Sequence, residues 1–412
     1  MKISIFTPTH NTMYLKELYD SIKEQSFDEW VIITNNTKVE IPEILNDSRV
    51  KIFEENTITD NVGALKRIAC FKCTGDILVE LDHDDLLTDG AVDEIRKAFE
   101  DKEVGFVYSN SANFKGDFES VEKYGSYYGW IHRDYIHKGH TLYEHVAFTP
   151  VPSSVSKIWY APNHVRAWRT EVYKQVGGHN PELQILDDGE LIMRTYLITK
   201  FKHIDKCLYL YRISTNGSNT WLKKNREIQE GVYPLYDKFI YKLVRRWAEV
   251  HNLLKIDLGG RFSCPEHFQS VDINGNPDYK MNLNERWTFK DNSVGVLRAH
   301  DVIEHLKDPI HFMKEAYRVL APGGYLMIQV PSTDGRGAFQ DPTHISFWNE
   351  NSFWYYTRAE QAKYIDTPVR FQAMRLTTGY PSKWHQENKI PYVFAHLQSL
   401  KDSHRVCGGV DI

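Results

Sequence analysis

The chain has 412 residues, of which 42% are hydrophobic and 25% are charged, and its formal net charge is −5. This length allows about two or three domains of ordinary globular composition, and the acidic balance argues against a nucleic-acid-binding protein. The sequence holds no run of about 18 apolar residues, so it predicts no transmembrane segment. The N-terminal residues lack the charged head and long apolar run of a signal peptide.

The cysteines indicate a reducing compartment. There are five, without the regular spacing of a disulfide framework, which favours free thiols and a cytoplasmic location. Cys70 and Cys73 form a CxxC pair within a predicted helix, and no second pair follows. We therefore expect two buried small residues there rather than zinc or redox chemistry.

Strands and helices alternate through the first hundred residues. Apolar runs predict strands, and helical spacing of apolar residues predicts the helices between them. In chain order the expected elements are a strand at 2–10, a helix at 12–26, strands at 30–36 and 50–56, a helix at 61–76, a strand at 76–82 and a helix at 89–101. This alternation is typical of an α/β domain with a mostly parallel sheet, whose ligands bind beyond the carboxyl ends of the strands.

Three aspartates follow the strand at 76–82. Asp82 and Asp84 are two residues apart, so on an extended chain they point the same way. Two hard oxygen ligands suit Mg²⁺ or Mn²⁺, with phosphates and water completing the shell. A calcium loop of the EF-hand type is excluded because Leu86 and Leu87 occupy the positions that require an acid or amide and a glycine. A solvated acidic turn before the next helix remains the alternative.

The order and spacing of these motifs resemble the family 2 glycosyltransferases of the GT-A type. The matching pieces are SIFTPTHN, NVGALKRIA, LDHDD, LDDGEL and YRIS. The resemblance implies a GT-A domain over residues 1–222. It also implies transfer of a sugar, with inversion, from a nucleotide-sugar donor, which we expect to be UDP-linked. A glycan or a lipid-linked glycan is the expected acceptor.

The resemblance implies donor contacts at several positions. Thr7 and Pro8 would border the nucleotide base, and Asn35 stands where the family usually has a base-binding aspartate. Lys66 and Arg67 would contact the donor, although charges on a helix surface are a common alternative.

The same resemblance assigns the metal and the base. Asp82 would contact ribose or metal, and Asp84 would hold the Mn²⁺ or Mg²⁺ ion. Asp188 would be the general base that takes the proton of the acceptor hydroxyl. The alternative is that the acids at 187–190 only stabilise the start of a helix through its dipole. Ser214 replaces a histidine that ligates the metal in many relatives.

Residues 113–162 are rich in Tyr, Trp and His, and we expect an irregular loop that binds the acceptor through flat aromatic faces. Packing against the sheet is the alternative. The histidines of this segment have no cysteine or HExxH motif among them, which disfavours a zinc site. Trp159 and Arg166 are the predicted acceptor contacts.

Helical apolar spacing continues through residues 225–253, and we interpret 223–252 as a helical connector that is broken near Pro234. The basic residues Lys242, Arg245 and Arg246 leave peripheral membrane contact open, although acids on the same helix weaken that interpretation.

A second α/β unit is predicted over residues 253–412. IDLGG at 256–260, Asp272 and RVLAPGGYL at 318–326 resemble the class I S-adenosylmethionine-dependent methyltransferases, which have a Rossmann-like fold. Glycines let the backbone approach a cofactor, and an acid after the second strand accepts hydrogen bonds from ribose. The cofactor contacts that the resemblance implies are Asp257, Gly259, Gly260, Asp272, Asn282, Leu283 and His300.

Two features of this unit depart from the family. The glycine motif lacks its usual third glycine, and too few residues separate Gly260 from Phe268 for a crossover helix. A degenerate structural domain is therefore the alternative to a cofactor-binding one. In the polar segment 334–349, Asp341 and His344 are candidate acid/base groups for methylating a hydroxyl, with a tight turn at Asp341 as the alternative.

The sequence thus predicts an enzyme of polysaccharide or surface-glycan biosynthesis in which one module transfers a sugar and the other O-methylates one. Two alternatives remain: a glycosyltransferase whose second module serves binding or assembly, and a sugar-binding protein without turnover. His305 is expected to be a packed or capping histidine.

Overall fold

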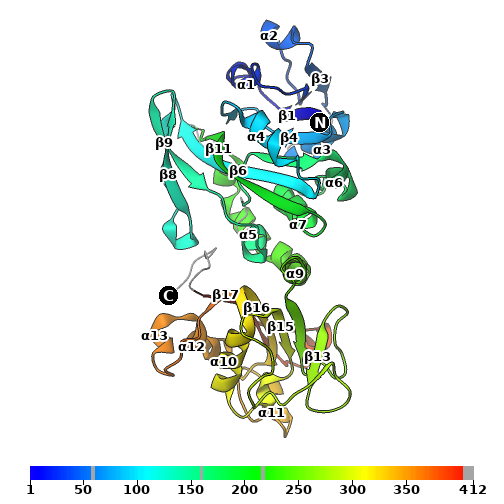
Figure 1. The fold of residues 1–412 in the computed structure, drawn as a ribbon, viewed down its shortest axis with the longest axis vertical. Coiled ribbons are helices and arrows are strands. Elements are labelled where there is room, and N and C mark those ends of the chain that lie inside the picture. Colours follow the sequence, from blue (N-terminus) through cyan, green and yellow to red (C-terminus); the bar gives the residue numbers. More distant parts are fainter. Residues whose placement is uncertain (57–60, 158–160, 215–218, 402–412) are drawn as a thin grey trace. The chain divides into compact units, whose positions relative to one another are not determined.

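The computed structural model describes residues 1–56, 61–157, 161–214 and 219–401 (Figure 1). The chain divides into two compact units, Met1–Ile240 and Tyr241–Ile412. The division falls within the segment that we predicted as a connector, and the domain limits at 222 and 253 stay a prediction.

The first unit is built on a mixed β-sheet that has eleven strands among the described residues. Its main path runs β3-β2-β1-β4-β10-β6-β11-β5, in which β3, β2, β1 and β4 are mutually parallel and β10 is antiparallel to both of its neighbours. The strands are β1 (Ile3–Thr9), β2 (Glu29–Thr34), β3 (Val50–Glu54), β4 (Ile77–Glu80), β5 (Leu86–Leu87), β6 (Val104–Lys115), β7 (Glu119–Ser120), β8 (Ile131–His137), β9 (His140–Val146), β10 (Arg166–Arg169) and β11 (Lys200–Arg212).

Helices cover this sheet because their apolar stripes match its buried strands. Leu15, Leu18 and Ile22 of α1 and Val92 and Ile95 of α4 join the same apolar cluster as the central strands. The helices of the unit are α1 (Leu15–Ile22), α2 (Pro42–Leu45), α3 (Val62–Lys72), α4 (Ala91–Ala98), η1 (Ser126–Tyr128), α5 (Pro152–Lys157), α6 (Thr170–Gln175), α7 (Asp187–Tyr196) and α8 (Thr220–Lys223). Helix α9 (Asn225–Val250) begins in this unit and continues past Ile240 into the second.

Two expectations about this part of the chain were wrong. The segment 113–162 is not mainly irregular, because β8 and β9 pair as an antiparallel hairpin whose second strand joins β6 (Figure 1). Helix α9 is also continuous through Pro234. A proline inside a helix removes one backbone hydrogen bond, and buried Val232 and Tyr236 anchor the helix on either side of it.

The second unit contains a seven-stranded sheet, counted over the described residues, in the order β14-β13-β12-β15-β16-β18-β17. The first five strands of this order, β14, β13, β12, β15 and β16, run parallel to one another, and β18 is antiparallel to both of its neighbours. The strands are β12 (Leu254–Leu258), β13 (Gln269–Asp272), β14 (Tyr279–Lys280), β15 (Val294–His300), β16 (Leu320–Pro331), β17 (Phe371–Gly379) and β18 (Tyr392–Ser399). As the short spacing predicts, no helix lies between β12 and β13, a stretch that is described throughout.

The helices of the second unit lie mostly between its later strands. They are η2 (Ile303–His305), α10 (Pro309–Val319), α11 (Gly337–Gln340), η3 (Glu350–Phe353), α12 (Trp354–Thr357), α13 (Ala359–Ala362) and α14 (Lys383–Glu387). Among the helices of the described residues, none combines the length and the apolar character that a membrane span requires. Cys70 and Cys73 are both buried and free, as expected.

Candidate functional site

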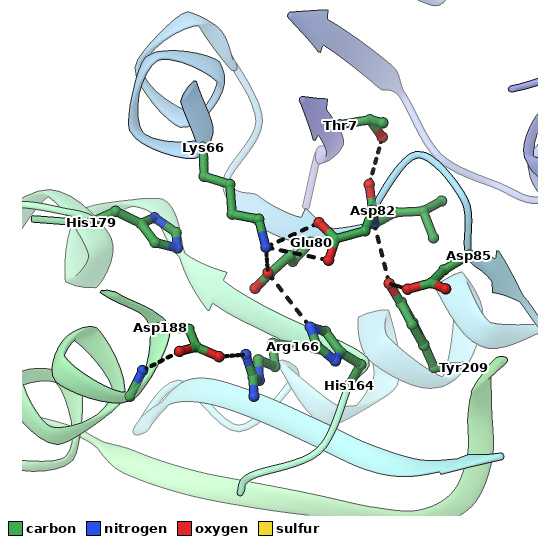
Figure 2. A network of polar contacts seen from close by, with 12 residues as sticks. Thr7, Lys66, Glu80, Asp82, Asp85, His164, Arg166, His179, Asp188 and Tyr209 are labelled. Atoms are coloured by element: carbon green, nitrogen blue, oxygen red, sulfur yellow. Dashed lines mark hydrogen bonds and ion pairs between the residues drawn. The ribbon is translucent and has the colours of Figure 1, made fainter. Parts of the chain in front are cut away.

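The candidate site of the first unit lies where β1 and β4 end. These two strands are parallel neighbours, so their carboxyl ends meet at one edge of the sheet. The turn that follows β4 carries the three aspartates and meets the end of β1, where the rings of His10 and His83 are 4.8 Å apart. The Thr7 hydroxyl donates to the Leu81 carbonyl at 2.8 Å and fixes the two segments together (Figure 2).

A lysine and two carboxylates form the centre of this site. Lys66 of α3 forms an ion pair with Glu80, and its Nζ lies 3.0 Å from Oδ1 of Asp82 (Figure 2). Glu80 is fully buried, and His164 Nε2 lies 3.6 Å from its Oε1. Burial would raise the pKa of Glu80, but Lys66 outweighs it and holds that pKa well below the usual value. Both members of the buried pair are therefore charged.

The three aspartates of the turn have different surroundings. Asp85 is buried, and its carboxylate accepts hydrogen bonds of 2.7 Å from the Tyr209 hydroxyl and from the Arg212 backbone N–H. It therefore ties the turn to β11. Asp82 and Asp84 are only partly buried, and burial together with repulsion from Asp82 raises the pKa of Asp84. These two carboxylates are the oxygen ligands that the turn offers to a cation.

A second acidic pair opens helix α7. Oδ2 of Asp188 lies 2.7 Å from the Arg166 guanidinium, and its Oδ1 accepts from the Gly189 N–H (Figure 2). Burial would raise the pKa of Asp188, but Arg166 outweighs it and lowers that pKa. Burial and the charge of Asp188 raise the pKa of Asp187 to about 7. Two adjacent carboxyls thus have opposite shifts in pKa.

Helix α3 approaches this acidic pair closely at its first turn. A Cβ placed on Gly63 would lie 2.6 Å from Oδ2 of Asp187, so only glycine fits. Asn61 begins the helix by accepting from the Ala64 N–H at 2.8 Å. The segment NVGALKRIA therefore brings Lys66 to the strand end and leaves room for Asp187.

The other predicted residues of this unit have these positions. Pro8 is buried in β1, and the Asn35 N–H donates to the Thr9 carbonyl at 2.7 Å, which places Asn35 at the same edge. Arg67 donates to the Gly177 carbonyl and lies 4.9 Å from the Phe71 ring. Trp159 lies outside the described residues.

Arg166 was predicted as an acceptor contact, and its surroundings favour another role. Its side chain is 1% exposed, and it donates to Asp188 and, at 2.9 Å, to the Pro162 carbonyl. A guanidinium buried in this way positions Asp188.

Sequence reasoning missed four residues of this site. Glu80 and Asp187 stood next to predicted residues, and a charged residue within an apolar strand was a usable signal for Glu80. His164 and His179 gave no signal because they are distant in sequence. Nδ1 of His179 lies 2.7 Å from the Tyr173 hydroxyl, its Nε2 is buried without a hydrogen-bond partner among the described residues, and burial lowers its pKa to about 4.

These residues fit the divalent cation that the resemblance implies. Two carboxylates in a partly exposed turn are a donor set that Mn²⁺ and Mg²⁺ accept. Glu80, Asp82 and His164 also place one ligand atom each within 4.8 Å of the others. Glu80 is fully buried and paired with Lys66, whereas Asp82 and Asp84 are partly exposed, so Asp82 and Asp84 are the ligands that we favour.

The glycine turn of the second unit follows β12. Gly259 has a φ of 73°, and a Cβ there would lie 2.3 Å from Cγ2 of Val302. A Cβ on Gly260 would lie 2.5 Å from Oδ2 of Asp257. Asp257 is fully buried and pairs with Arg298 at 2.7 Å. Both glycines are therefore required by the close packing of this turn against Val302 and Asp257.

The remaining predicted cofactor contacts follow neighbouring strands. Asp272 ends β13 and accepts from the Asn274 N–H at 2.8 Å, and Leu283 is buried in the core. The Asn282 amide donates to Glu285 at 2.9 Å. The glycine turn beside an acid at the end of the adjacent strand fits S-adenosylmethionine.

His300 ends β15, and its ring is held by protein groups. Nδ1 lies 2.9 Å from Arg298 and Nε2 lies 3.0 Å from the Tyr241 hydroxyl. Burial, together with Arg298, lowers the pKa of His300 to about 3. The imidazole is therefore neutral and fixed.

Asp341 forms the tight turn that we weighed against a catalytic role, because its Oδ1 accepts from the Thr343 N–H at 2.8 Å and from the Thr343 hydroxyl at 2.7 Å. His344 Nε2 lies 3.9 Å from both Asp341 and Glu304.

Comparison with known proteins gives one match for each unit. Residues 4–157 match the family model described as Glycosyl transferase family 2, and residues 244–328 match the model described as Methyltransferase domain. Comparison with curated proteins finds no match.

Solved structures resemble the chain more distantly. TarS 1–349 of S. aureus is 17% identical, with 60% of this chain and 72% of that chain covered and a TM-score of 0.43. The mannosyltransferase PcManGT from Pyrobaculum calidifontis, in complex with GDP-Man and Mn²⁺, is 16% identical, with 58% and 68% covered and a TM-score of 0.40.

Proposed function

We propose, from the premise that this chain is an enzyme with a family 2 glycosyltransferase domain and a methyltransferase domain, that it builds and methylates a glycan. The first domain would transfer a sugar, with inversion, from a UDP-linked donor to a glycan or lipid-linked glycan. The second would O-methylate a sugar with S-adenosylmethionine. We propose that the enzyme acts in the cytoplasm, in polysaccharide or surface-glycan synthesis. The proposed domains are residues 1–222 and 253–412, joined by a connector at 223–252.

The arrangement of charges supports the sugar transfer. Lys66 and the Asp82–Asp84 turn lie at the end of β4, where the diphosphate of a donor would meet a lysine and a cation site. A divalent cation held by Asp82 and Asp84 would neutralise charge that develops on the leaving diphosphate. Thr7, Pro8 and Asn35 at the same edge would border the base.

The single observation that carries the proposal is the Asp188–Arg166 pair. Proton removal from an acceptor hydroxyl requires an ionised carboxylate in a fixed position. Arg166 keeps Asp188 ionised and, with the Gly189 N–H, fixes its orientation. We therefore propose Asp188 as the general base.

Asp187 is a second candidate for the base, because its pKa of about 7 is closer to the pH at which the enzyme works. A base with that pKa takes up a proton more readily than Asp188 does. The pH dependence of the rate separates the two candidates.

For the methyltransferase domain, we propose that the backbone at Gly259 and Gly260 and the carboxylate of Asp272 hold S-adenosylmethionine, which supplies the methyl group. Asp257 braces the glycine turn through its pair with Arg298. Asn282 and Leu283 would flank the adenine. The alternative, in which this domain only binds or assembles, predicts no methyl transfer.

Release of UDP from UDP-sugars in the presence of Mn²⁺ tests the transferase. The full chain is compared with Asp84→Ala, Asp188→Asn and, as a matched control at an exposed position, Asp117→Asn. We expect loss of release with the first two variants and no loss with the control. Unchanged release with Asp84→Ala would contradict the metal site, and a wild-type chain that binds UDP-sugars without turnover would support a sugar-binding protein.

Calorimetry with S-adenosylmethionine, followed by transfer of a labelled methyl group to a glycan, tests the second domain. Binding and transfer that are both lost with Asp272→Asn would support our assignment. Absence of binding to the wild-type chain would favour the non-catalytic alternative.

A further inference from the structure

Two histidines and a glutamate meet at one end of the methyltransferase sheet. Glu304 and His305 belong to η2, which follows β15, and His344 comes from the loop after α11. One ligand atom of each residue lies within 4.8 Å of the others. The two imidazole rings are 4.9 Å apart and roughly perpendicular.

The glutamate of this cluster is buried, and its carboxylate has no well-formed hydrogen bond within the described part of the chain. Glu304 is 2% exposed, and neither of its carboxylate oxygens accepts a well-formed hydrogen bond from the described residues. Buried carboxylates are almost always hydrogen-bonded, paired or bound to a metal. The carboxylate of Glu304 departs from this rule, which points to a partner that the described residues do not supply.

Both histidines hold Nδ1 against a backbone carbonyl, which leaves Nε2 available as a ligand atom. His344 Nδ1 lies 2.9 Å from the Ala338 carbonyl, and His305 Nδ1 lies 3.2 Å from the Thr343 carbonyl. His305 Nδ1 also lies 3.1 Å from the Thr343 hydroxyl, which donates its own proton to Asp341 and so accepts from the ring. A carbonyl accepts hydrogen bonds only, so each Nδ1 carries the proton in the neutral ring and each Nε2 keeps a lone pair. His344 Nε2 lies 3.9 Å from Oε1 of Glu304.

We propose that Glu304, His305 and His344 form a binding site for a divalent transition metal of the Zn²⁺ type. Two imidazoles and one carboxylate are a set that Zn²⁺ and Fe²⁺ accept, and three protein ligands leave positions open for substrate oxygen. Ligand atoms around a tetrahedral Zn²⁺ lie about 3.4 Å apart. Side-chain movements of less than about 1 Å therefore close the cluster around an ion. The carbonyls of Ala338 and Thr343 fix the rings from behind.

The location of the site indicates its role, which rests on the proposed methyl transfer. Val302 touches the glycine turn at Gly259, and Glu304 follows it by two residues. The cluster thus lies at the same strand edge as the cofactor cradle. The cation would bind the acceptor hydroxyl and lower its pKa. The hydroxyl oxygen then forms a bond to the methyl carbon, the bond from that carbon to the sulfonium sulfur breaks, and the hydroxyl proton passes to water.

A protonated Glu304 that donates to His344 Nε2 would explain the cluster without a metal. The separation of 3.9 Å is too long for that hydrogen bond. The two explanations differ in metal content, which can be measured directly.

The test is a titration of the metal-stripped full chain with Zn²⁺, and with Co²⁺ to detect histidine ligation by its absorption. We compare wild type with His344→Gln, His305→Gln, Asp82→Asn and the exposed control Glu360→Gln, after circular dichroism has shown that each is folded. We expect His344→Gln and His305→Gln to lower the affinity for one equivalent of metal by at least about 100-fold. Asp82→Asn and Glu360→Gln should retain that equivalent.

Equal binding by wild type, His344→Gln and His305→Gln would overturn the proposed site, as would a wild-type chain that binds no such equivalent. His305 is the less buried of the two histidines, so its substitution keeps the test valid if His344→Gln does not fold. A wild-type chain that binds the ion but methylates no glycan would support the metal site and refute the methyl transfer.

Discussion

Replacement of Lys66 by methionine is expected to destabilise the first unit strongly. Lys66 is 9% exposed and is the lysine paired with the fully buried Glu80. Methionine preserves the apolar stem and removes only the ammonium, so Glu80 stays buried with His164 at 3.6 Å as its nearest remaining basic group. Removal of one partner from a buried ion pair costs about 3–5 kcal/mol.

Hydrogen exchange followed by peptide mass spectrometry measures this cost within the first unit, where a whole-chain melting curve would mix two units. With 1.36 kcal/mol for each factor of ten, buried amides of β1 and β4 should exchange between about 160-fold and about 4,700-fold faster. The matched control is Lys72→Met at an exposed position of the same helix, which should change exchange by less than about threefold.

The double variant Lys66→Met/Glu80→Gln removes both charges, so most of the lost protection should return. Exchange in Lys66→Met within threefold of wild type would refute the argument that the pair is buried and coupled. If the double variant is protected but binds UDP-sugars more weakly than wild type, Lys66 also contacts the donor.

Three further predictions concern acid–base chemistry and backbone space. If Asp188 is the base, Asp188→Asn abolishes sugar transfer and the wild-type rate persists at pH 6; a rate that falls as the pH drops through about 7 would instead identify Asp187. Glu29, 1% exposed and paired with Lys51 at 2.5 Å, has a pKa lowered from 4.5 to about 2, because Lys51 and its other hydrogen bonds outweigh burial. The ionised Glu29 carboxylate therefore contributes about 3 kcal/mol to the free energy of unfolding, which is present above pH 4.5 and lost toward pH 2. Glu29→Gln should show a smaller acid-induced loss of hydrogen-exchange protection in β2. An acid response equal to that of the wild type would contradict this. Gly259→Ala would force a Cβ against Val302 at a positive φ, so S-adenosylmethionine binding measured by calorimetry should weaken at least tenfold, whereas equal affinity would argue against a cradle there.

Local sequence patterns determined most of the elements of this protein. The predicted fold class, a GT-A glycosyltransferase domain followed by a Rossmann-like methyltransferase domain, is confirmed by the family matches and the two sheets. Strands with a clear apolar run were predicted to within about two residues, as with β1 and β2. The missing crossover helix after Gly260 followed from chain length alone.

The sequence pattern was less informative where tertiary contacts override it. The β8–β9 hairpin has polar and aromatic residues on both faces, so it has no clean period of two, and its pairing with β6 decides its structure. Pro234 normally ends a helix, but buried contacts on both sides keep α9 continuous.

The chemistry of the sites shows the same division. The sequence alone placed Asp82, Asp84 and Asp188 near strand and helix ends, because such positions follow from the order of the elements. Only the tertiary structure decided that Arg166 pairs with Asp188 and that Glu304 lies beside His344. The physical reason is that a carboxylate's charge state and partners depend on burial and on groups distant in sequence, and no local period encodes either.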